Sequence, residues 1–492
     1  MSRPHVHRPS HAAAGLLALT LCVSSASGAP AARVGSPGPH PRLGTRSTAV
    51  QPITHVVVIV QENRSVDNLF QKLPGARTQS WGYNSQGKKV ALQPLGLSTT
   101  WDPSHNHLPN ATYSGGFVTE YANGASDGWD HETFACKLPS ECDGATAFAY
   151  VRPSHVKNYY DLATTYAFSD MTFQVNEGPS FPAHQYLIAG QAGGLFDTVH
   201  HYGEAENPAG LEGSGKTGGC DRDGFGIAVV DVLDAYPGTE PTSIFPCEDY
   251  QTVFDTFDQT YPPPHGTFNW RYYAAEEESI WDAPIGVKHL YAKYIHQGGE
   301  NGRGNFSIDP GGRKFASDVA HGTLPALTYV VPCAAWSDHP GSTGGQGPFW
   351  VSFLTNTIGA SSYWSNTAII VLWDDWGGWY DHVVPGHTPN PYHNPNDPIE
   401  YGYRVPLMVV SPYARHGFID HTAQTQMAVL TFIEHTFSLP SLQASDKLEY
   451  SGSDLSQMFD FTQHVKPYKP EHVPVGLFPA KGCPKGGLDP GE

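Results

Sequence analysis

The stretch from Val56 to Val60 restricts the possible folds more than any other part of the chain. Its residues, Val-Val-Val-Ile-Val, are all apolar and β-branched, with no polar residue between them. Such a run predicts a strand that is buried on both faces, as strands of parallel sheets are. Three further apolar runs have the same character: Leu327 to Val331, Ala368 to Leu372, and Pro406 to Val410. We therefore predict a sheet that contains these four strands.

Helical candidates lie in the segments between these strands. They are residues 156–163, 252–259 and 424–437. Strands that alternate with helices along a chain are typical of α/β proteins. The predicted fold class is therefore α/β and doubly wound, with a mostly parallel central sheet and helices on both faces.

The remaining sequence indicates one domain with long loops. The chain has 52 Gly and 42 Pro without a repeat, which is typical of an irregular, loop-rich protein. We assign residues 51–465 to this domain, residues 29–50 to a flexible lead-in, and residues 466–492 to a C-terminal tail packed on the domain. The Gly-rich segments 200–245 and 295–315 are expected to be loops or excursions.

Residues 1–28 have the features of a signal peptide. Positively charged Arg3 and Arg8 precede an apolar core from Ala12 to Val23, and small residues follow. This core is too short to span a bilayer comfortably. Cys22 follows a leucine that is too bulky for the usual lipoprotein pattern. We therefore expect a secreted or periplasmic protein.

The cysteine pattern agrees with export. Of the 7 cysteines, one lies in the predicted leader, and the others are Cys136, Cys142, Cys220, Cys247, Cys333 and Cys483. An even set in an exported protein predicts disulfides, although several connectivities satisfy it. Short separations favour the pairs Cys136–Cys142 and Cys220–Cys247. Cys333 with Cys483 would then connect the C-terminal tail to the body of the domain.

The charge of the chain bears on its partners. A formal net charge of −19 disfavours binding to nucleic acids and strong attraction to anionic membranes. We expect no nucleic-acid partner and no transmembrane segment in the mature protein. The charge does not decide whether the protein makes transient contact with a membrane surface. The sequence does not predict an oligomeric state.

Polar residues follow three of the predicted strands. Glu62 and Asn63 come after the first strand, Asp374 and Asp375 after the third, and His339 after the second. Ligands of open α/β sheets bind beyond the carboxyl ends of the strands, so these side chains are expected to meet. Each of these polar segments alone could be an ordinary strand end or polar turn. Several oxygen donors close together, however, suit a divalent cation. Adjacent Asp374 and Asp375 repel each other unless a cation or proton separates them.

Ser180 is the candidate nucleophile. It lies in Gly-Pro-Ser-Phe-Pro-Ala-His, where Gly178 and Pro179 predict a turn and Pro182 suits the first turn of a helix. A hydroxyl at a helix N-terminus lies where phosphate oxygens bind readily. The alternative is an ordinary serine N-cap.

Taken together, these blocks resemble the bacterial phosphoesterase family that includes non-specific phospholipases C and acid phosphatases. Its members share an alkaline-phosphatase-like α/β fold. The resemblance runs in family order from about Ile53 to Pro440. The similar blocks are QENRSVD from Gln61, DPSH from Asp102, GPSFPAH from Gly178, SDHP from Ser337, DDWGGWYDHV from Asp374, and RVPLMVVSPYARHGFIDH from Arg404.

The resemblance implies a metal site beside the nucleophile. One divalent metal ion, of unspecified identity, would be held by Glu62, Asn63, Asp374 and Asp375, with Ser180 next to it. Asp375 stands where the plant phospholipases have Glu, a change that keeps a carboxylate ligand. The cation would lower the pKa of the serine hydroxyl and neutralise charge on the phosphate.

The resemblance also assigns histidines and shows departures. His105 and His339 would contact the phosphoryl group or donate protons, whereas the role of His382 is left open. Ala183 and His184 stand where the family has Asn and Arg. Substrate contacts on that side of the site are therefore not predicted.

The implied activity is hydrolysis of phosphate esters through a phosphoserine intermediate, most specifically phospholipase C-type cleavage of phosphodiesters. One alternative is an acid phosphatase acting on phosphomonoesters. Another is an inactive exported binding protein on the same fold. Trp376, Trp379 and Tyr380 could line the pocket of either enzyme.

Other catalytic motifs are rejected. Residues 210–217, Gly-Leu-Glu-Gly-Ser-Gly-Lys-Thr, match a P-loop pattern, but no strand precedes them and no helix follows, so we predict a loop. The chain lacks the G-x-S-x-G elbow of α/β-hydrolases. The residues after Ser180 lack the arginine that a sulfatase site contains.

Overall fold

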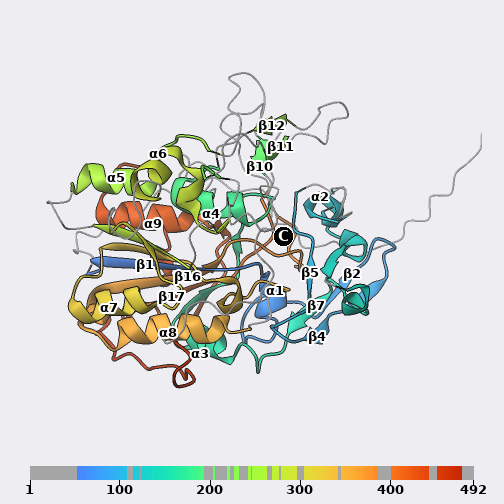
Figure 1. Ribbon diagram of the computed structural model, residues 1–492. Helices are drawn as coiled ribbons and strands as arrows, with labels where there is room; N and C mark the ends of the chain where they lie inside the picture. The colour runs from blue at the N-terminus through green and yellow to red at the C-terminus, as the bar shows by residue number, and fades with distance from the viewer. Residues whose placement is uncertain are drawn as a thin grey trace, which may run out of the picture.

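The structure, a computed structural model, is organised around one central β-sheet (Figure 1). The described residues are 52–107, 115–121, 124–136, 138–192, 203–205, 219–221, 227–231, 242–244, 247–262, 269–275, 279–295, 304–341, 345–385, 401–442 and 452–478. Within them the central sheet has eight strands, in the order β14-β13-β15-β1-β16-β17-β8-β18. The strands are β1 (His55–Gln61), β8 (Ala167–Ser169), β13 (Trp270–Ala274), β14 (Phe306–Ile308), β15 (Leu327–Val330), β16 (Thr367–Trp373), β17 (Leu407–Val410) and β18 (Phe418–Asp420).

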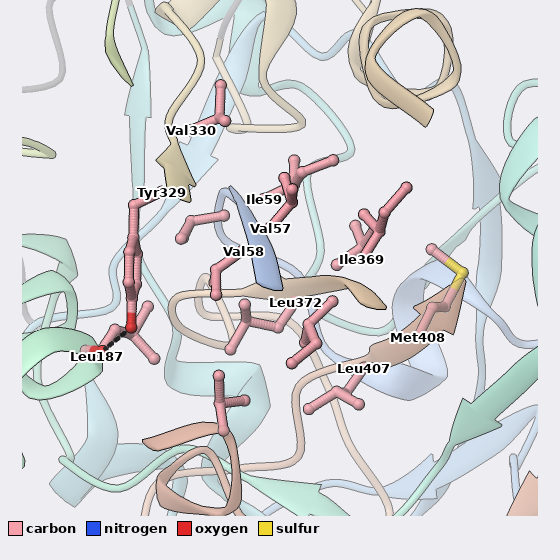
Figure 2. Close-up of a cluster of buried hydrophobic side chains, with 14 of the residues drawn as sticks. Val57, Val58, Ile59, Leu187, Tyr329, Val330, Ile369, Leu372, Leu407 and Met408 are labelled. Atoms are coloured by element: carbon pink, nitrogen blue, oxygen red, sulfur yellow. Dashed lines mark hydrogen bonds between the residues drawn. The ribbon is translucent and has the colours of Figure 1, made fainter. Parts of the chain in front are cut away.

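Strand β1 lies inside the sheet and is buried on both faces. It pairs in parallel with β15 and β16, so that Val58 lies opposite Tyr329 on one side and Ile370 on the other. The side chains from Val56 to Val60 are at most 1% exposed. In the core around them, the Tyr329 hydroxyl donates a hydrogen bond of 2.9 Å to the Leu187 carbonyl (Figure 2). The predicted buried parallel strand and the α/β fold class are confirmed.

Helices cover both faces of the sheet (Figure 1). One face carries α4 (Ser180–Ala189), α5 (Val253–Thr260), α6 (Lys288–Leu290) and α9 (Met427–Phe437), and the other carries α3 (Lys157–Thr165), α7 (Arg313–His321) and α8 (Gly347–Gly359). The three predicted helices correspond to α3, α5 and α9. Helix α9 begins later than expected, because Gln424 and Thr425 form β19 (Gln424–Thr425), which pairs with β9 (Thr172–Phe173).

Strand β17 is antiparallel within the mostly parallel sheet that the sequence predicted. The prediction placed residues 406–410 in this sheet without assigning their direction, and β17 pairs antiparallel with both β16 and β8. Leu407, which begins β17, lies opposite Leu372 near the end of β16. Arg404 just before β17 forms an ion pair with Asp381, which follows β16. The chain therefore enters β17 from the carboxyl edge of the sheet, and an apolar run alone carries no information about that direction.

The sheet also contains strands that the sequence did not predict. β13 and β14 extend it beyond β15, and β8 and β18 form the opposite edge. Strand β13 reads Trp-Arg-Tyr-Tyr-Ala, which is not a β-branched run. The expectation of a loop over residues 295–315 is wrong in part, because this segment contains β14 and the start of α7. Within residues 200–245, a separate antiparallel sheet is formed by β10 (Gly203–Ala205), β11 (Ile227–Asp231) and β12 (Thr242–Ile244).

A second apolar cluster packs beyond the end of the central sheet, among short elements at the right of Figure 1. The elements are α1 (Val66–Leu69), β2 (Trp81–Tyr83), β3 (Lys89–Ala91), β4 (Gln93–Leu95), β5 (Trp101–Pro103), α2 (Phe117–Glu120), β6 (Phe134–Cys136) and β7 (Ala149–Val151). The cluster consists of Leu92, Phe117, Trp129, Ala147, Phe148, Trp376, Tyr380 and Tyr403. Trp376 and Tyr380 follow β16, so the cluster holds this excursion against the carboxyl edge of the sheet.

Two of the expected disulfides are present. Cys136 is bonded to Cys142, and Cys220 to Cys247. Cys333 is also disulfide-bonded, and its expected partner Cys483 lies outside the described residues. The predicted signal peptide, the lead-in and the P-loop-like segment 210–217 lie outside them as well.

The described part of the C-terminal segment lies against α8 and the turn that follows it. The Tyr468 ring is 5.0 Å from that of Trp364, and its hydroxyl donates hydrogen bonds to Thr355 and Asn356. The ring of Phe478 lies 4.8 Å from that of Trp336. Separately, no helix in the described parts of the chain is both long and apolar enough to cross a membrane.

Candidate active site

The carboxyl ends of β1 and β16 bring four polar side chains together. These strands pair in register to their last residues, and Glu62, Asn63, Asp374 and Asp375 follow directly. The Asn63 N–H donates a hydrogen bond of 2.9 Å to Asp374 Oδ1. Asn63 has a φ of 57°, a left-handed conformation that Asn adopts more readily than most residues. All four side chains are fully buried.

The Ser180 hydroxyl lies against this group. Ser180 is the first residue of α4, and Pro179 is the N-cap. Its Oγ donates a hydrogen bond of 3.1 Å to Asp375 Oδ2 and accepts one of 3.2 Å from Asn63 Nδ2. The same amide lies 3.0 Å from both oxygens of Asp375. The serine therefore does not act as the N-cap, and its hydroxyl is oriented by the acidic group.

Two glycines after β16 allow a close approach of backbone to backbone. The Gly377 N–H donates a hydrogen bond of 2.7 Å to Asp375 Oδ1 and so orients this carboxylate. Gly377 and Gly378 have φ values of 65° and 66°. A Cβ at Gly377 would lie 2.2 Å from the Asn63 carbonyl oxygen. No residue with a side chain fits at this position without moving β1 or β16.

Replacing Gly377 with alanine is expected to destabilise the protein by about 2–5 kcal/mol. The left-handed conformation costs an alanine about 1–2 kcal/mol, and overpacking adds about 1–3 kcal/mol. Gly87→Ala is the matched control, because Gly87 has a φ of 70° and a Cβ there would have no other atom within 4 Å. Urea unfolding of both variants separates the two costs. Equal destabilisation would show that the contact with Asn63 is relieved without cost.

His184 contacts the carboxylates of Glu62 and Asp374 from the same helix as Ser180. Its Nε2 lies 2.9 Å from Glu62 Oε1 and 3.6 Å from Asp374 Oδ2. Residues four apart share one face of a helix, so Ser180 and His184 both face the acidic group. Sequence reasoning noted His184 only as a departure from the family pattern. The spacing of four from the candidate nucleophile was the signal that could have placed it in the site.

His105 and His339 lie next to each other, and His105 contacts Asn63 of the group. His105 Nε2 is 3.0 Å from Asn63 Nδ2, and its Nδ1 is 2.9 Å from the Pro103 carbonyl. Nδ1 therefore carries the proton in this arrangement, and Nε2 accepts from the amide. The His339 ring centre lies 5.8 Å from that of His105, and its Nδ1 is 2.6 Å from the Pro340 carbonyl.

Burial shifts the ionisation of these groups. It raises the pKa of Glu62 well above its ordinary value, and the charge of Asp374 adds to this. The pKa of Asp375 is raised for the same two reasons. Burial lowers the pKa of His184 to about 4 and that of His339 to about 3. The protein environment thus disfavours charge on every one of these groups, which a bound cation would reverse for the carboxylates.

The donor atoms of the group fit a divalent metal ion. Within the described residues, Glu62 Oε2, Asn63 Oδ1 and Asp374 Oδ2 are fully buried and make no hydrogen bond. Buried polar atoms rarely stay without partners. Ligand atoms of Glu62, His184 and Asp374 all lie within 4.8 Å of one another. Carboxylate and amide oxygens with an imidazole nitrogen form a donor set that divalent metals accept.

A second acidic group beside α1 is paired with an arginine side chain. Asp67, Asp381 and His382 also lie close together, but Arg404 forms hydrogen bonds of 2.8 and 3.0 Å to Asp381. His382 Nδ1 is 2.6 Å from Asp67 Oδ2. The buried guanidinium supplies the positive charge here, so this group forms an ion-pair network. His382, whose role the sequence left open, belongs to this network.

The structure brings all the side chains proposed from the sequence into one buried region. They are Ser180, His105, His339, Glu62, Asn63, Asp374 and Asp375. His184 joins them, and their individual roles in chemistry stay predictions. Trp376 and Tyr380 pack in the second apolar cluster, and Trp379 is fully buried, 5.3 Å from Trp101 between ring centres.

Curated relatives have similar sequences over most of this chain. A non-hemolytic phospholipase C of Burkholderia pseudomallei is 24% identical over 433 residues, which cover 80% of this chain and 56% of the relative. A non-hemolytic phospholipase C of Pseudomonas aeruginosa is 23% identical and covers 91% of this chain and 62% of its own length. Phospholipase C A of Mycobacterium tuberculosis is 24% identical, with 87% and 81% covered. The chain thus spans less than two thirds of the length of the first two relatives.

A solved structure of a protein in the alkaline phosphatase superfamily from Vibrio parahaemolyticus is also similar, with a TM-score of 0.31 at 10% identity over 61% of this chain and 64% of that one. The family model described as "Phosphoesterase family" matches residues 53–440. This range includes the whole central sheet and each residue of the candidate site. The chain belongs to the phosphoesterase family.

Proposed function

We propose that the chain is an exported, metal-dependent phosphoesterase that cleaves phosphate esters through a phosphoserine intermediate. The observation that carries this proposal is the Ser180 hydroxyl, which lies at the N-terminus of α4 and is hydrogen-bonded to Asp375. Helix N-termini favour phosphate oxygens, because their N–H groups point outward. The unpaired oxygens of Glu62 and Asp374 in the same group support a metal requirement.

In the proposed reaction, Ser180 Oγ attacks phosphorus as the bond to the leaving alcohol breaks. The hydrogen bond to Asp375 orients Oγ, and the adjacent amide of Asn63 can donate to a phosphoryl oxygen. A bound divalent cation would neutralise phosphate charge and favour ionisation of the attacking hydroxyl. Water then breaks the serine–phosphorus linkage, which releases phosphate or a phospho-alcohol and restores the hydroxyl.

His105 and His339 are the candidates for protonating the leaving alcohol. Their ring centres lie 5.8 Å apart in an edge-to-face arrangement, and His105 is hydrogen-bonded to Asn63 beside the nucleophile. With a pKa of about 3, His339 is neutral near pH 7 in the free protein. The negative charge of a phosphoryl group next to the ring would favour its protonated form.

Phospholipase C-type cleavage of phosphodiesters is the specific form that we propose. Three relatives named phospholipase C support it. An acid phosphatase is the second candidate, because the site side chains are at most 9% exposed, a depth that suits a compact phosphomonoester. The leader-like N-terminus and the two disulfides support export, since disulfides persist in oxidising compartments.

The proposal is tested by hydrolysis of p-nitrophenyl phosphorylcholine and p-nitrophenyl phosphate by the purified protein. We expect turnover of the choline ester, and loss of that turnover after treatment with EDTA. Turnover of the monoester alone would replace phospholipase C by acid phosphatase. Absence of turnover with both esters, across metals and pH, would favour an inactive binding protein.

A further inference from the structure

His184 occupies a position that the reaction proposed above does not use. It is 1% exposed, projects from α4 one turn after Ser180, and directs Nε2 toward two carboxylates. By the resemblance to the family an arginine is expected at this position, and this chain has a histidine there.

We propose that His184 is a protein ligand of the cation that Glu62 and Asp374 hold, and that it makes the site prefer zinc and similar transition metals to Mg²⁺ and Ca²⁺. The inference rests on the proposed metal-dependent function and adds to it the class of metal.

The spacing of the donor atoms matches that of ligands around one ion. Two ligands at about 2.1 Å from a tetrahedral zinc ion lie about 3.4 Å from each other. His184 Nε2 lies 2.9 Å from Glu62 Oε1 and 3.6 Å from Asp374 Oδ2. Both distances are close to that value. Small movements of buried side chains therefore suffice for shared coordination.

A plain hydrogen bond between His184 and Glu62 explains less of the site. One N–H of a neutral imidazole satisfies only Oε1 of Glu62. Oε2 of Glu62 and Oδ2 of Asp374 would still be fully buried without a hydrogen bond. Buried polar atoms that are left unpaired destabilise the folded protein. An ion bound by His184 Nε2, by Asp374 Oδ2 and by both oxygens of Glu62 would satisfy Oε2 and Oδ2 at once.

The preference for zinc and similar transition metals follows from the types of donor atom in the site. Imidazole nitrogen suits zinc, copper, iron and nickel, whereas Mg²⁺ and Ca²⁺ prefer oxygen ligands. Without His184, the group would offer only carboxylate, amide and hydroxyl oxygens. Its placement four residues after Ser180 also connects the ligand and the nucleophile through one turn of α4.

The test compares the full chain with His184→Gln and His289→Gln. Glutamine can keep a hydrogen bond to Glu62 but removes the nitrogen ligand. His289 is the matched control, because its Nε2 also lies 2.9 Å from a carboxylate, that of Asp255, in another part of the structure. Zinc affinity is measured by competition with a chromogenic chelator, and Mg²⁺ affinity by calorimetry. Nitrogen coordination is measured by electron spin echo modulation of the Cu²⁺-loaded proteins.

We expect His184→Gln to weaken Zn²⁺ binding by more than about 100-fold, because loss of even an outer partner of a ligand costs about 10–100-fold. Mg²⁺ affinity should change little, the imidazole-nitrogen modulation should fall, and His289→Gln should behave like the unsubstituted protein. Equal zinc affinity and modulation in His184→Gln would overturn the inference while leaving metal-dependent hydrolysis intact. Zinc bound through His184 without any ester hydrolysis would instead contradict the proposed function alone. Absence of metal binding would overturn both.

Discussion

Replacing Ser180 with alanine is expected to lower kcat for p-nitrophenyl phosphorylcholine by roughly 10⁴-fold or more, as removal of a catalytic nucleophile does in other hydrolases. The substitution removes the only atom that can form the proposed covalent intermediate. It should change KM little, since the metal and the remaining polar groups still bind the phosphoryl group. Steady-state rates with enough enzyme to detect slow background turnover measure both parameters.

Ser352→Ala is the control for this experiment. Ser352 is also fully buried in a helix and accepts a hydrogen bond from Asn158, but it lies on α8, apart from the acidic group. Its replacement should leave kcat unchanged. A loss of activity in both variants would indicate damage to the fold, and full activity in Ser180→Ala would rule out Ser180 as the nucleophile.

The covalent intermediate offers a second readout. Acid quenching during turnover of p-nitrophenyl phosphate should leave a phosphoryl group on the peptide that contains Ser180, detectable by mass spectrometry. With the choline ester, the same peptide should carry phosphorylcholine. Turnover with no modified peptide at any quench time would favour direct attack by water.

Removal of the metal is expected to abolish hydrolysis and to lower thermal stability together. The carboxylates of Glu62, Asp374 and Asp375 lie within a fully buried group, and their mutual repulsion is relieved by a cation. At a free metal concentration about 1,000 times the Kd, binding stabilises the folded state by about 4 kcal/mol. Calorimetry before and after treatment with EDTA, followed by re-addition of Zn²⁺, measures this difference.

The Ser180→Ala variant separates the two effects of the metal. It keeps the carboxylates, so its melting temperature should fall with EDTA as much as that of the unsubstituted protein. Its hydrolysis rate should be low in both states. If chelation leaves both the melting temperature and the rate of the unsubstituted protein unchanged, the acidic group does not hold an exchangeable metal.

Apolar patterns in the sequence predict some strands of the central sheet and miss others. The β-branched runs at β1, β15 and β16 predict buried strands because a side chain on either face of an inner strand contacts the core. β13 was missed, since its Arg271 and aromatic residues do not form such a run. β17 was found, but its antiparallel direction was not predicted, because strand direction depends on the edge of the sheet from which the chain enters the strand.

Some residues of the candidate site could be placed from the sequence, and others required the structure. Residues that follow β1 and β16 could be placed together from the sequence, because parallel strands end at one edge of a sheet. The resemblance to the phosphoesterase family added His105 and gave Ser180 and His339 their expected roles. His184 was visible in the sequence, yet its contact with Glu62 requires the orientation of α4 against the sheet.

Sequence alone was sufficient for four strands of the central sheet (β1, β15, β16 and β17), for the carboxylates that follow β1 and β16, and for the family of the chain. These depend on local hydrophobic patterns and on short motifs that keep their order along the chain. The tertiary structure was needed for the direction of β17, for the separate ion-pair network around Arg404, and for the position of His184 beside Glu62 and Asp374. Each of these depends on how segments that are distant in the sequence pack or connect in space, which no local pattern records.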